Sequence, residues 1–217
     1  MKKVISVLAV TLALTGCAAS KMPLNANTSA ALKDQSIVQT TRKTRNFVAT
    51  VPAPGIALMA GADVKYTDGN EIVKIYDIED PAKSISQRLL QELQTARSVR
   101  PVGSAVFVDS TDPEKQAASA KCVAKYILDV ETGAWSFLYF PTDWTHYRVM
   151  YTADARLIDA ESKKVIAEGH CARIPDATPT APTYNELLDN QAQVLKKELA
   201  LAADACVAKF KAEMLAL

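Results

Sequence analysis

Few side chains in this sequence could carry chemistry: four cysteines and two histidines stand among 217 residues. His146 and His170 have no serine or cysteine motif beside them, so each is expected to have a structural role. The seven glycines are too widely spaced to form G-x-G-x-x-G, G-x-x-x-x-G-K-[ST] or G-x-S-x-G. Dinucleotide, P-loop and nucleophile-elbow sites are therefore excluded, and we predict no catalytic residue and no cofactor.

The first cysteine follows a secretion signal. Lys2 and Lys3 precede an apolar run from Val4 to Leu14. As a helix this run would span only about 16 Å, against roughly 30 Å of bilayer hydrocarbon. A transmembrane anchor is therefore disfavoured, and a signal peptide over residues 1–16 is expected.

The residues Leu14-Thr15-Gly16-Cys17 resemble the lipobox of bacterial lipoproteins. In that family the cysteine becomes the first mature residue and carries a diacylglycerol and an amide-linked fatty acid, so the resemblance implies lipidation of Cys17. Several acyl chains, at ~0.8 kcal/mol per buried methylene, make a stable anchor. An Asp after the cysteine favours the inner membrane in that family, so Ala18 implies the outer membrane and a body facing the periplasm. An ordinary signal peptide with an incidental cysteine is the alternative.

The other cysteines, Cys122, Cys171 and Cys206, would then lie in an oxidising compartment, where one must stay unpaired. Cys171 falls on the apolar face of an expected strand and Cys206 on the apolar stripe of the last helix, so we expect these two to form a disulfide. Its loop closure would stabilise the fold by roughly 3 to 4 kcal/mol. Cys122 could replace either partner. No metal site is predicted, because the adjacent His170 and Cys171 would point to opposite faces of their strand.

The aromatic residues are concentrated between Gly133 and Tyr151, a segment that holds half of the Phe, Trp and Tyr residues of the chain. Those that alternate along the flanking strands are expected to pack the sheet: Trp135, Phe137, Tyr147 and Tyr151. Tyr139, Phe140 and Trp144 surround an expected turn. We predict that these three form a contact surface for a partner, since aromatic side chains give a large contact area at low entropic cost.

Two charged groups are assigned structural roles. The basic residues 42–45 are expected in a solvated loop rather than on lipid headgroups, because three charges contribute ~3 kcal/mol at best beside an anionic surface. Asp80 is expected to cap a helix beginning at Pro81, since a capping carboxylate accepts the free N–H groups of the first turn. Asp77 and Glu79 beside it are then a solvated edge and not an acidic site.

The elements that position these residues follow from caps and periodicity. Asp-Pro pairs at 80–81 and 112–113 and a capping box from Thr183 to Glu186 mark helix starts. A period of two from Tyr147 to Ile158 marks a long strand. Expected helices cover 81–98, 113–124 and 183–215, and expected strands cover 36–40, 71–77, 105–108, 125–130, 147–158 and 164–174. A short helix is the alternative for 71–77.

This order predicts an α/β fold of the α+β type, with helices packed on a mainly antiparallel sheet and a long C-terminal helix. The composition, 49% apolar and 23% charged, can bury a core, and a net charge of +1 gives no basic surplus for nucleic acid. The small, polar residues after Cys17 indicate a flexible tether. We therefore expect a signal peptide over 1–16, the lipidated Cys17 and its tether over 17–36, and a single periplasmic domain over 37–217.

Three segments also resemble a group of uncharacterised proteobacterial lipoproteins: Ile78-Glu79-Asp80-Pro81-Ala82, Trp135 to Tyr151, and Leu157-Ile158-Asp159. This resemblance covers most of residues 50–210 and implies no activity. More distantly, the long hairpin that ends in D-x-x-[ST]-x-x-V, here Asp159 to Val165, is similar to transport-auxiliary lipoproteins of lipid-handling ABC systems.

We therefore expect an outer-membrane lipoprotein that is not an enzyme and whose periplasmic domain binds another envelope component, a protein, a glycan or a lipid. Two alternatives remain. An accessory lipoprotein of a lipid transport system would show a large apolar cavity under the aromatic hairpin, and an envelope hydrolase would show a deep cleft with paired carboxylates.

Overall fold

The structure, a computed structural model, describes residues 21–50, 66–120 and 123–217. The predicted signal peptide, the predicted lipidation site Cys17 and the unassigned Cys122 lie outside the described residues. Among the helices within the described ranges, none has the length and the hydropathy to cross a membrane.

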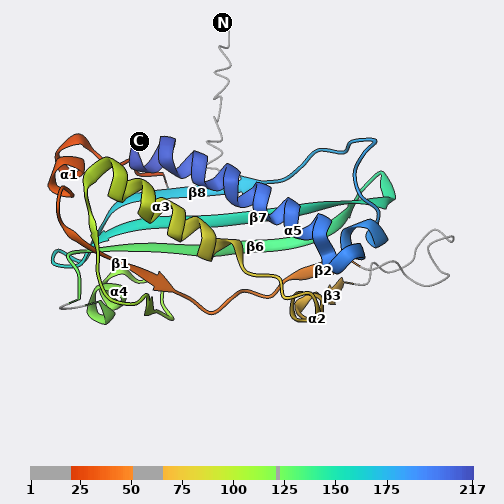
Figure 1. The fold of residues 1–217 in the computed structure, drawn as a ribbon, viewed down its shortest axis with the longest axis horizontal. Helices are drawn as coiled ribbons and strands as arrows, with labels where there is room; N and C mark the ends of the chain where they lie inside the picture. The colour runs from red at the N-terminus through yellow and green to blue at the C-terminus, as the bar shows by residue number, and fades with distance from the viewer. Residues whose placement is uncertain (1–20, 51–65, 121–122) are drawn as a thin grey trace, which may run out of the picture.

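The core of the fold is an antiparallel meander of three long strands: β6 (Tyr126–Phe140), β7 (Asp143–Asp159) and β8 (Lys164–Arg173). Two further strands, β1 (Ser36–Thr41) and β2 (Val48–Thr50), pair in parallel with the other edge of β6. Figure 1 shows β8 and β1 at opposite edges of this sheet. Shorter strands extend it: β3 (Tyr66–Asp68) beside β2, and β4 (Arg100–Pro101) and β5 (Val106–Phe107) beside β1.

Two long helices, α3 (Pro81–Arg97) and α5 (Tyr184–Lys209), cover one face of the sheet (Figure 1). A π-helical turn, η1 (Phe210–Leu215), continues α5. The short α4 (Pro113–Ser119) packs Ala117 against Ile127 and Ile158 on the other face. The predicted fold class, helices on a mainly antiparallel sheet in one domain with a long C-terminal helix, is confirmed.

The start signals predicted from the sequence are present. The Asp80 side chain accepts a hydrogen bond from the N–H of Ala82 and so caps α3, which ends where Ser98 adopts a left-handed conformation. Thr183 and Glu186 form the reciprocal capping box at the start of α5. Both caps satisfy N–H groups that a helix leaves unpaired at its start.

A disulfide joins Cys171 on β8 to Cys206 on α5, the pair expected from the sequence. It lies within the core between the sheet and its covering helix, where both residues are buried. The aromatic residues expected to pack the sheet are also buried: Trp135, Phe137, Tyr147 and Tyr151.

The flexible tether predicted over 17–36 is wrong for the residues from Lys21 onward. These residues belong to the folded body and include the short helix α1 (Ala26–Ala31). Leu24 and Leu32 are buried in the main core, and the side chain of Arg97 donates a hydrogen bond to Ser29. The segment is held by these two buried leucines together with hydrogen bonds to the body.

Residues 71–77 do not form the expected strand. The short-helix alternative is correct, as α2 (Asn70–Ile75). The position beside β2 is taken by β3 (Tyr66–Asp68), and the Gly69 N–H donates to the Phe47 carbonyl and turns the chain away from the sheet. A Cβ on Gly69 would lie 2.7 Å from that carbonyl oxygen, so only glycine fits there.

The last helix is interrupted near its start. Asp189 leaves the helical conformation, and Asn190, Gln191 and Ala192 follow with φ values of 51°, 61° and 55°. The apolar period predicted one continuous helix from 183 to 215, which is wrong at these positions. The apolar period resumes after the kink, where Leu195 and Leu199 are both buried in the core.

Candidate functional site

The outer edge of β6 (Tyr126–Phe140) is interrupted in the middle. β1 pairs with β6 as far as Leu128, and pairing resumes with β2 only at Ser136. Between β1 and β2, the segment 42–47 leaves the sheet and holds β6 by side-chain bonds instead. The Arg45 Nε donates to the Thr132 carbonyl over 3.0 Å, and the Trp135 Nε1 donates to the Arg45 carbonyl over 2.7 Å.

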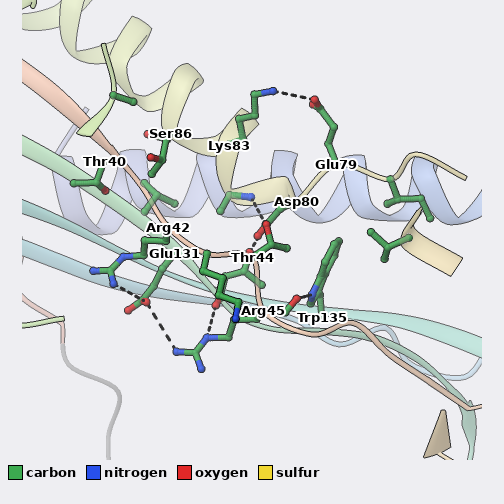
Figure 2. A pocket seen from close by; sticks show the side chains of 18 of the residues that line it. Thr40, Arg42, Thr44, Arg45, Glu79, Asp80, Lys83, Ser86, Glu131 and Trp135 are labelled. Carbon is green, nitrogen blue, oxygen red and sulfur yellow. Dashed lines mark hydrogen bonds and ion pairs between the residues drawn. The ribbon is translucent and has the colours of Figure 1, made fainter. Parts of the chain in front are cut away.

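This interruption opens a cleft of about 640 Å³ between the segment 42–47 and the first turn of α3. Its floor is apolar and includes Ile78, Val130 and Trp135. Its rim is polar, and Figure 2 shows Lys83 and Ser86 of α3 on one side with Thr44 and Arg45 on the other. A closed apolar floor with a polar rim is typical of sites that bind small ligands or short segments of a partner.

Asp80 lies in the wall of this cleft, at the start of α3. The Thr132 hydroxyl donates a hydrogen bond to the Asp80 carboxylate, and Tyr151 Oη lies 3.0 Å from Thr132 Oγ1. Burial raises the pKa of Asp80 above its usual value, although the bonds from Thr132 and the Ala82 N–H work against this shift. The cleft therefore contains a carboxyl group, that of Asp80, with a raised pKa. The same group caps α3.

A buried charge cluster lies on the opposite face of β6, centred on Asp129, whose side chain is 1% exposed. Arg42 holds both carboxylate oxygens at 2.9 and 2.8 Å, and Arg156 donates at 2.7 Å. Thr40 and Gln116 donate two further bonds. Burial alone would raise the pKa of Asp129, but the hydrogen bonds from Arg42 and Thr40 and the charges of Arg42 and Arg156 outweigh it, so this pKa is lowered.

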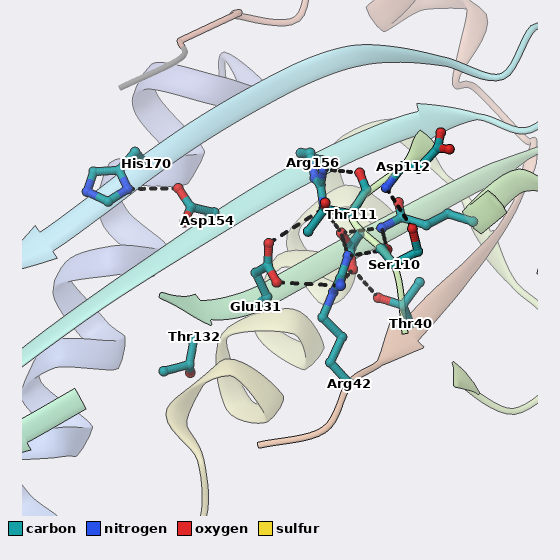
Figure 3. Close-up of polar contacts among 12 residues, drawn as sticks. Thr40, Arg42, Ser110, Thr111, Asp112, Glu131, Thr132, Asp154, Arg156 and His170 are labelled. Atoms are coloured by element: carbon teal, nitrogen blue, oxygen red, sulfur yellow. Dashed lines mark hydrogen bonds and ion pairs between the residues drawn. The ribbon is translucent and has the colours of Figure 1, made fainter. Parts of the chain in front are cut away.

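Glu131 forms the outer layer of this cluster (Figure 3). Its carboxylate lies 3.5 Å from Arg42, 3.7 Å from Arg156 and 3.9 Å from Arg45. A second, more open cavity of about 890 Å³ begins there on the α4 side of the sheet and shares Arg42 and Arg45 with the cleft. The segment 42–47 therefore separates two hollows, and the cluster fixes one end of that segment.

No pattern in the sequence predicted this cluster. Arg42 is not in a solvated loop as expected, because its side chain is only 12% exposed, whereas Lys43 and Arg45 are exposed. The available signal was one acidic residue, Asp129, within the otherwise apolar run from Tyr126 to Val130. A carboxylate at such a position requires buried partners, but their identity depends on the pairing of distant strands.

The three residues predicted as a partner-binding surface differ in exposure. Phe140 is buried at 3%, and the Arg148 guanidinium lies 5.5 Å from its ring centre, so Phe140 is not available as a contact. Tyr139 is half-buried, 6.2 Å from the ring of Tyr147. Trp144 is 51% exposed at the hairpin tip. Sequence alternation could not separate these residues, since the β6–β7 register shifts between Tyr139 and Phe140.

Both histidines pair with neighbouring carboxylates and lie away from the cleft. His146 Nδ1 is 2.5 Å from Asp143 at the hairpin tip, and His170 Nδ1 is 2.7 Å from Asp154 across β7 and β8. Within the described parts of the chain, no group of three or more His, Cys, Asp or Glu side chains could hold a metal ion.

No protein-family model matches the chain, and no curated protein matches it. Among solved structures, the chain is similar to a PelC dodecamer protein from Paraburkholderia phytofirmans, with 13% identity over 90% of this chain and 94% of that one and a TM-score of 0.37. A DUF330 protein from Xanthomonas campestris has 9% identity over 88% and 91% and a TM-score of 0.36. The lipoprotein GNA1162 from Neisseria meningitidis has 15% identity over 81% and 99% and a TM-score of 0.30. TM-scores this low do not establish a shared fold or function.

Proposed function

We propose that this chain is an outer-membrane lipoprotein, lipidated at Cys17, whose periplasmic domain binds another envelope component without catalysis. The observation that carries the binding role is the cleft of about 640 Å³ at the interrupted edge of β6. Sheet edges are normally paired or covered, because unpaired backbone groups attract other chains. Here the segment 42–47 is bonded to β6 by side chains and leaves a hollow with an apolar floor beside it, which suits a bound partner.

The envelope location rests on features of the sequence and on the disulfide. The charged and apolar start, the lipobox and Ala18 support export and anchoring at the outer membrane. The buried Cys171–Cys206 disulfide supports an oxidising compartment such as the periplasm, since structural disulfides persist there and are rare in the cytosol.

The hydrogen bonds that occupy the carboxylates of Asp129 and Asp80 favour a binding function over hydrolysis. Asp129 is surrounded by Thr40, Arg42, Gln116 and Arg156, so it has no free position for a substrate or a water nucleophile. Asp80 faces the cleft but caps α3 and accepts the Thr132 hydroxyl. A glycoside hydrolase of the common type needs two carboxyl groups that can exchange protons with water or substrate.

The rim of the cleft favours a polar component over acyl chains. Gln39 and Ser86 are joined there by a 2.7 Å hydrogen bond, and Lys83 and Arg45 are exposed at the mouth. A carrier of acyl chains would need a cavity closed off from water, whereas this cleft is open at its charged rim. A protein or a glycan segment with hydroxyl, amide or carboxylate groups matches this rim.

Photocrosslinking in intact cells tests the proposal. A photoreactive amino acid replaces Lys83 on the cleft rim, Trp144 at the hairpin tip or, as a control, Gln94, which is exposed on α3 and does not line the cleft. We expect a discrete adduct from position 83 and none from position 94. Adducts from position 144 alone would move the binding site to the hairpin, and adducts from neither position would contradict the binding role.

A further inference from the structure

The start of the described chain is fixed to the body at one defined place. Met22 and Glu168 exchange backbone hydrogen bonds of 2.9 and 2.8 Å, so Met22 extends the free edge of β8. The Leu24 N–H donates to the Met214 carbonyl over 2.8 Å, and the Lys21 ammonium lies 3.0 Å from Glu213 on η1. From Lys21 onward, the polypeptide therefore has no freedom to act as a spacer.

Only three residues, 18–20, separate Cys17 from this fixed point. Even a fully extended chain spans at most about 3.6 Å per residue, so Lys21 lies within about 14 Å of Cys17. The polar layer on each side of a bilayer is roughly 5 to 8 Å deep, the difference between the full thickness and the hydrocarbon core. A Cys17 whose acyl chains enter the hydrocarbon thus holds Lys21 close to the lipid headgroups.

We infer that the outer edge of β8 around Glu168 and the exposed side of η1 lie against the surface of the bilayer. We call this surface, formed by residues 21–23, Glu168, Ala212 and Glu213, the anchor face. The inference depends on the lipidation of Cys17 in the proposed function and adds to it which side of the domain meets the lipid.

The anchor face carries charged side chains, and their charges balance. Lys21 and Lys209 both lie near Glu213, and the hydrogen bond from Lys21 and both positive charges lower its pKa. With Glu168, which also belongs to the anchor face, these residues carry two positive and two negative charges, so the inferred orientation rests on the short tether and not on charge. Met22 adds an apolar side chain that is 37% exposed.

This orientation determines where the cleft opens. β8 and β1 are opposite edges of the sheet, with β7 and β6 between them (Figure 1). Neighbouring strands are about 4.8 Å apart, so the interrupted edge of β6 lies on the order of 10 to 15 Å from the anchor face. The cleft therefore opens away from the membrane, and its partner approaches from the periplasm and not from the lipid.

The test compares two exposed alanines in the full-length lipidated protein reconstituted in vesicles of mixed zwitterionic and anionic phospholipid. Ala212→Cys labels the anchor face and Ala105→Cys labels the cleft rim, both in a Cys122→Ala background with the disulfide oxidised. An environment-sensitive fluorophore on each cysteine is quenched by lipids that carry a nitroxide on the headgroup. We expect at least a twofold greater loss of fluorescence at position 212 than at 105.

Equal quenching at the two positions, or stronger quenching at 105, would overturn the orientation. The intact mass of the same sample separates this result from a failure of the proposed function, which an unacylated Cys17 would indicate. Insertion of about twenty Gly and Ser residues after Ser20 gives a tether with a mean span of about 25 Å. The ratio of the fluorescence loss at position 212 to that at position 105 should then fall at least twofold. An unchanged ratio would show that the short tether does not set the orientation.

Discussion

Asp129 and Arg156 lie directly opposite each other on β6 and β7, and Arg156 Nη2 donates to the Asp129 carboxylate over 2.7 Å. The side chains of Asp129 and Arg156 are 1% and 9% exposed, so the ion pair is almost fully shielded from solvent. A buried ion pair adds little stability compared with two apolar residues of similar volume. The loss of one partner is costly, however, because it leaves a buried charge without a counter-ion. Asp129 therefore makes the shortest contacts that hold Arg42, and it helps to fix one end of the segment 42–47 beside the cleft.

Asp129→Ala should cost about 3 to 5 kcal/mol of unfolding free energy, because Arg42 and Arg156 lose their buried counter-ion. Glu131→Gln is the matched control. Its ion pairs are 3.5 Å or longer and Gln keeps the size of the side chain, so its cost should be clearly smaller than that of Asp129→Ala. Urea denaturation at pH 7 measures both values, and similar costs for the two variants would contradict the central role of Asp129.

The same cluster predicts a dependence on pH. The pKa of Asp129 is lower in the folded than in the unfolded chain, so its stabilisation is fully present above the ordinary Asp pKa near 3.9. It is lost as the pH falls through the lowered folded value. The free energy cost of Asp129→Ala should therefore be constant from about pH 7 to 5 and shrink in more acidic solution, which denaturation at several pH values measures.

The contribution of Asp80 to stability should depend on pH in the direction opposite to that of Asp129. Burial raises its folded pKa, so folding becomes more favourable as the pH falls from that value towards the unfolded pKa near 3.9. Asn caps helices as well as Asp does, and Asp80→Asn should thus be more stable than the wild type at pH 7, with the difference shrinking near pH 4. Asp80→Ala loses the cap and should cost about 1 kcal/mol. A destabilising Asp80→Asn at pH 7 would argue against this assignment.

Alanine substitutions of Phe140 and Trp144 in the β6–β7 hairpin should change stability by very different amounts. Phe140 is 3% exposed, so Phe140→Ala should cost about 3 to 5 kcal/mol of stability. Trp144 is 51% exposed, and Trp144→Ala should change stability by less than about 0.5 kcal/mol. Thermal denaturation followed by circular dichroism measures both changes. A large loss of stability from Trp144→Ala would mean that its ring packs against the body and is not available to a partner.

At the kink of α5, a glycine substitution should stabilise the protein, whereas glycine within a helix normally destabilises it. Gln191 is exposed with φ near 61°, a left-handed conformation that costs a side-chain-bearing residue about 1 to 2 kcal/mol. Gln191→Gly should therefore stabilise the protein by about 0.5 to 1 kcal/mol. Gln193→Gly, in the helical part after the kink, should destabilise it by about the same amount. Equal destabilisation by both changes would indicate an uninterrupted helix.

The elements predicted correctly are those specified by local chemistry. The Asp-Pro starts at 80–81 and 112–113, the capping box at Thr183 and the alternation along β7 each depend on neighbouring residues. Cys171 and Cys206 could be paired because each falls on an apolar face that must meet the core. Such features follow from period and capping alone.

The candidate site required information that no local pattern contains. The cleft exists because β1 and β2 pair with two separated parts of β6, a relationship between residues almost ninety positions apart. The packing of residues 21–36 was missed because Leu24 and Leu32 have no period, and their burial depends on α3 and η1. Asp129 was visible as an acidic residue in an apolar strand, but Arg42 comes from the segment after β1 and Arg156 from β7.

Both the location of the domain at the outer membrane and the orientation of its cleft depend on the lipid anchor at Cys17. Intact-protein and peptide mass spectrometry of material from the native host tests it most directly. We predict a mature chain that begins at Cys17 and carries the mass of a diacylglycerol and an additional acyl group. A free thiol at this position, or a chain that retains residues 1–16, would contradict the account.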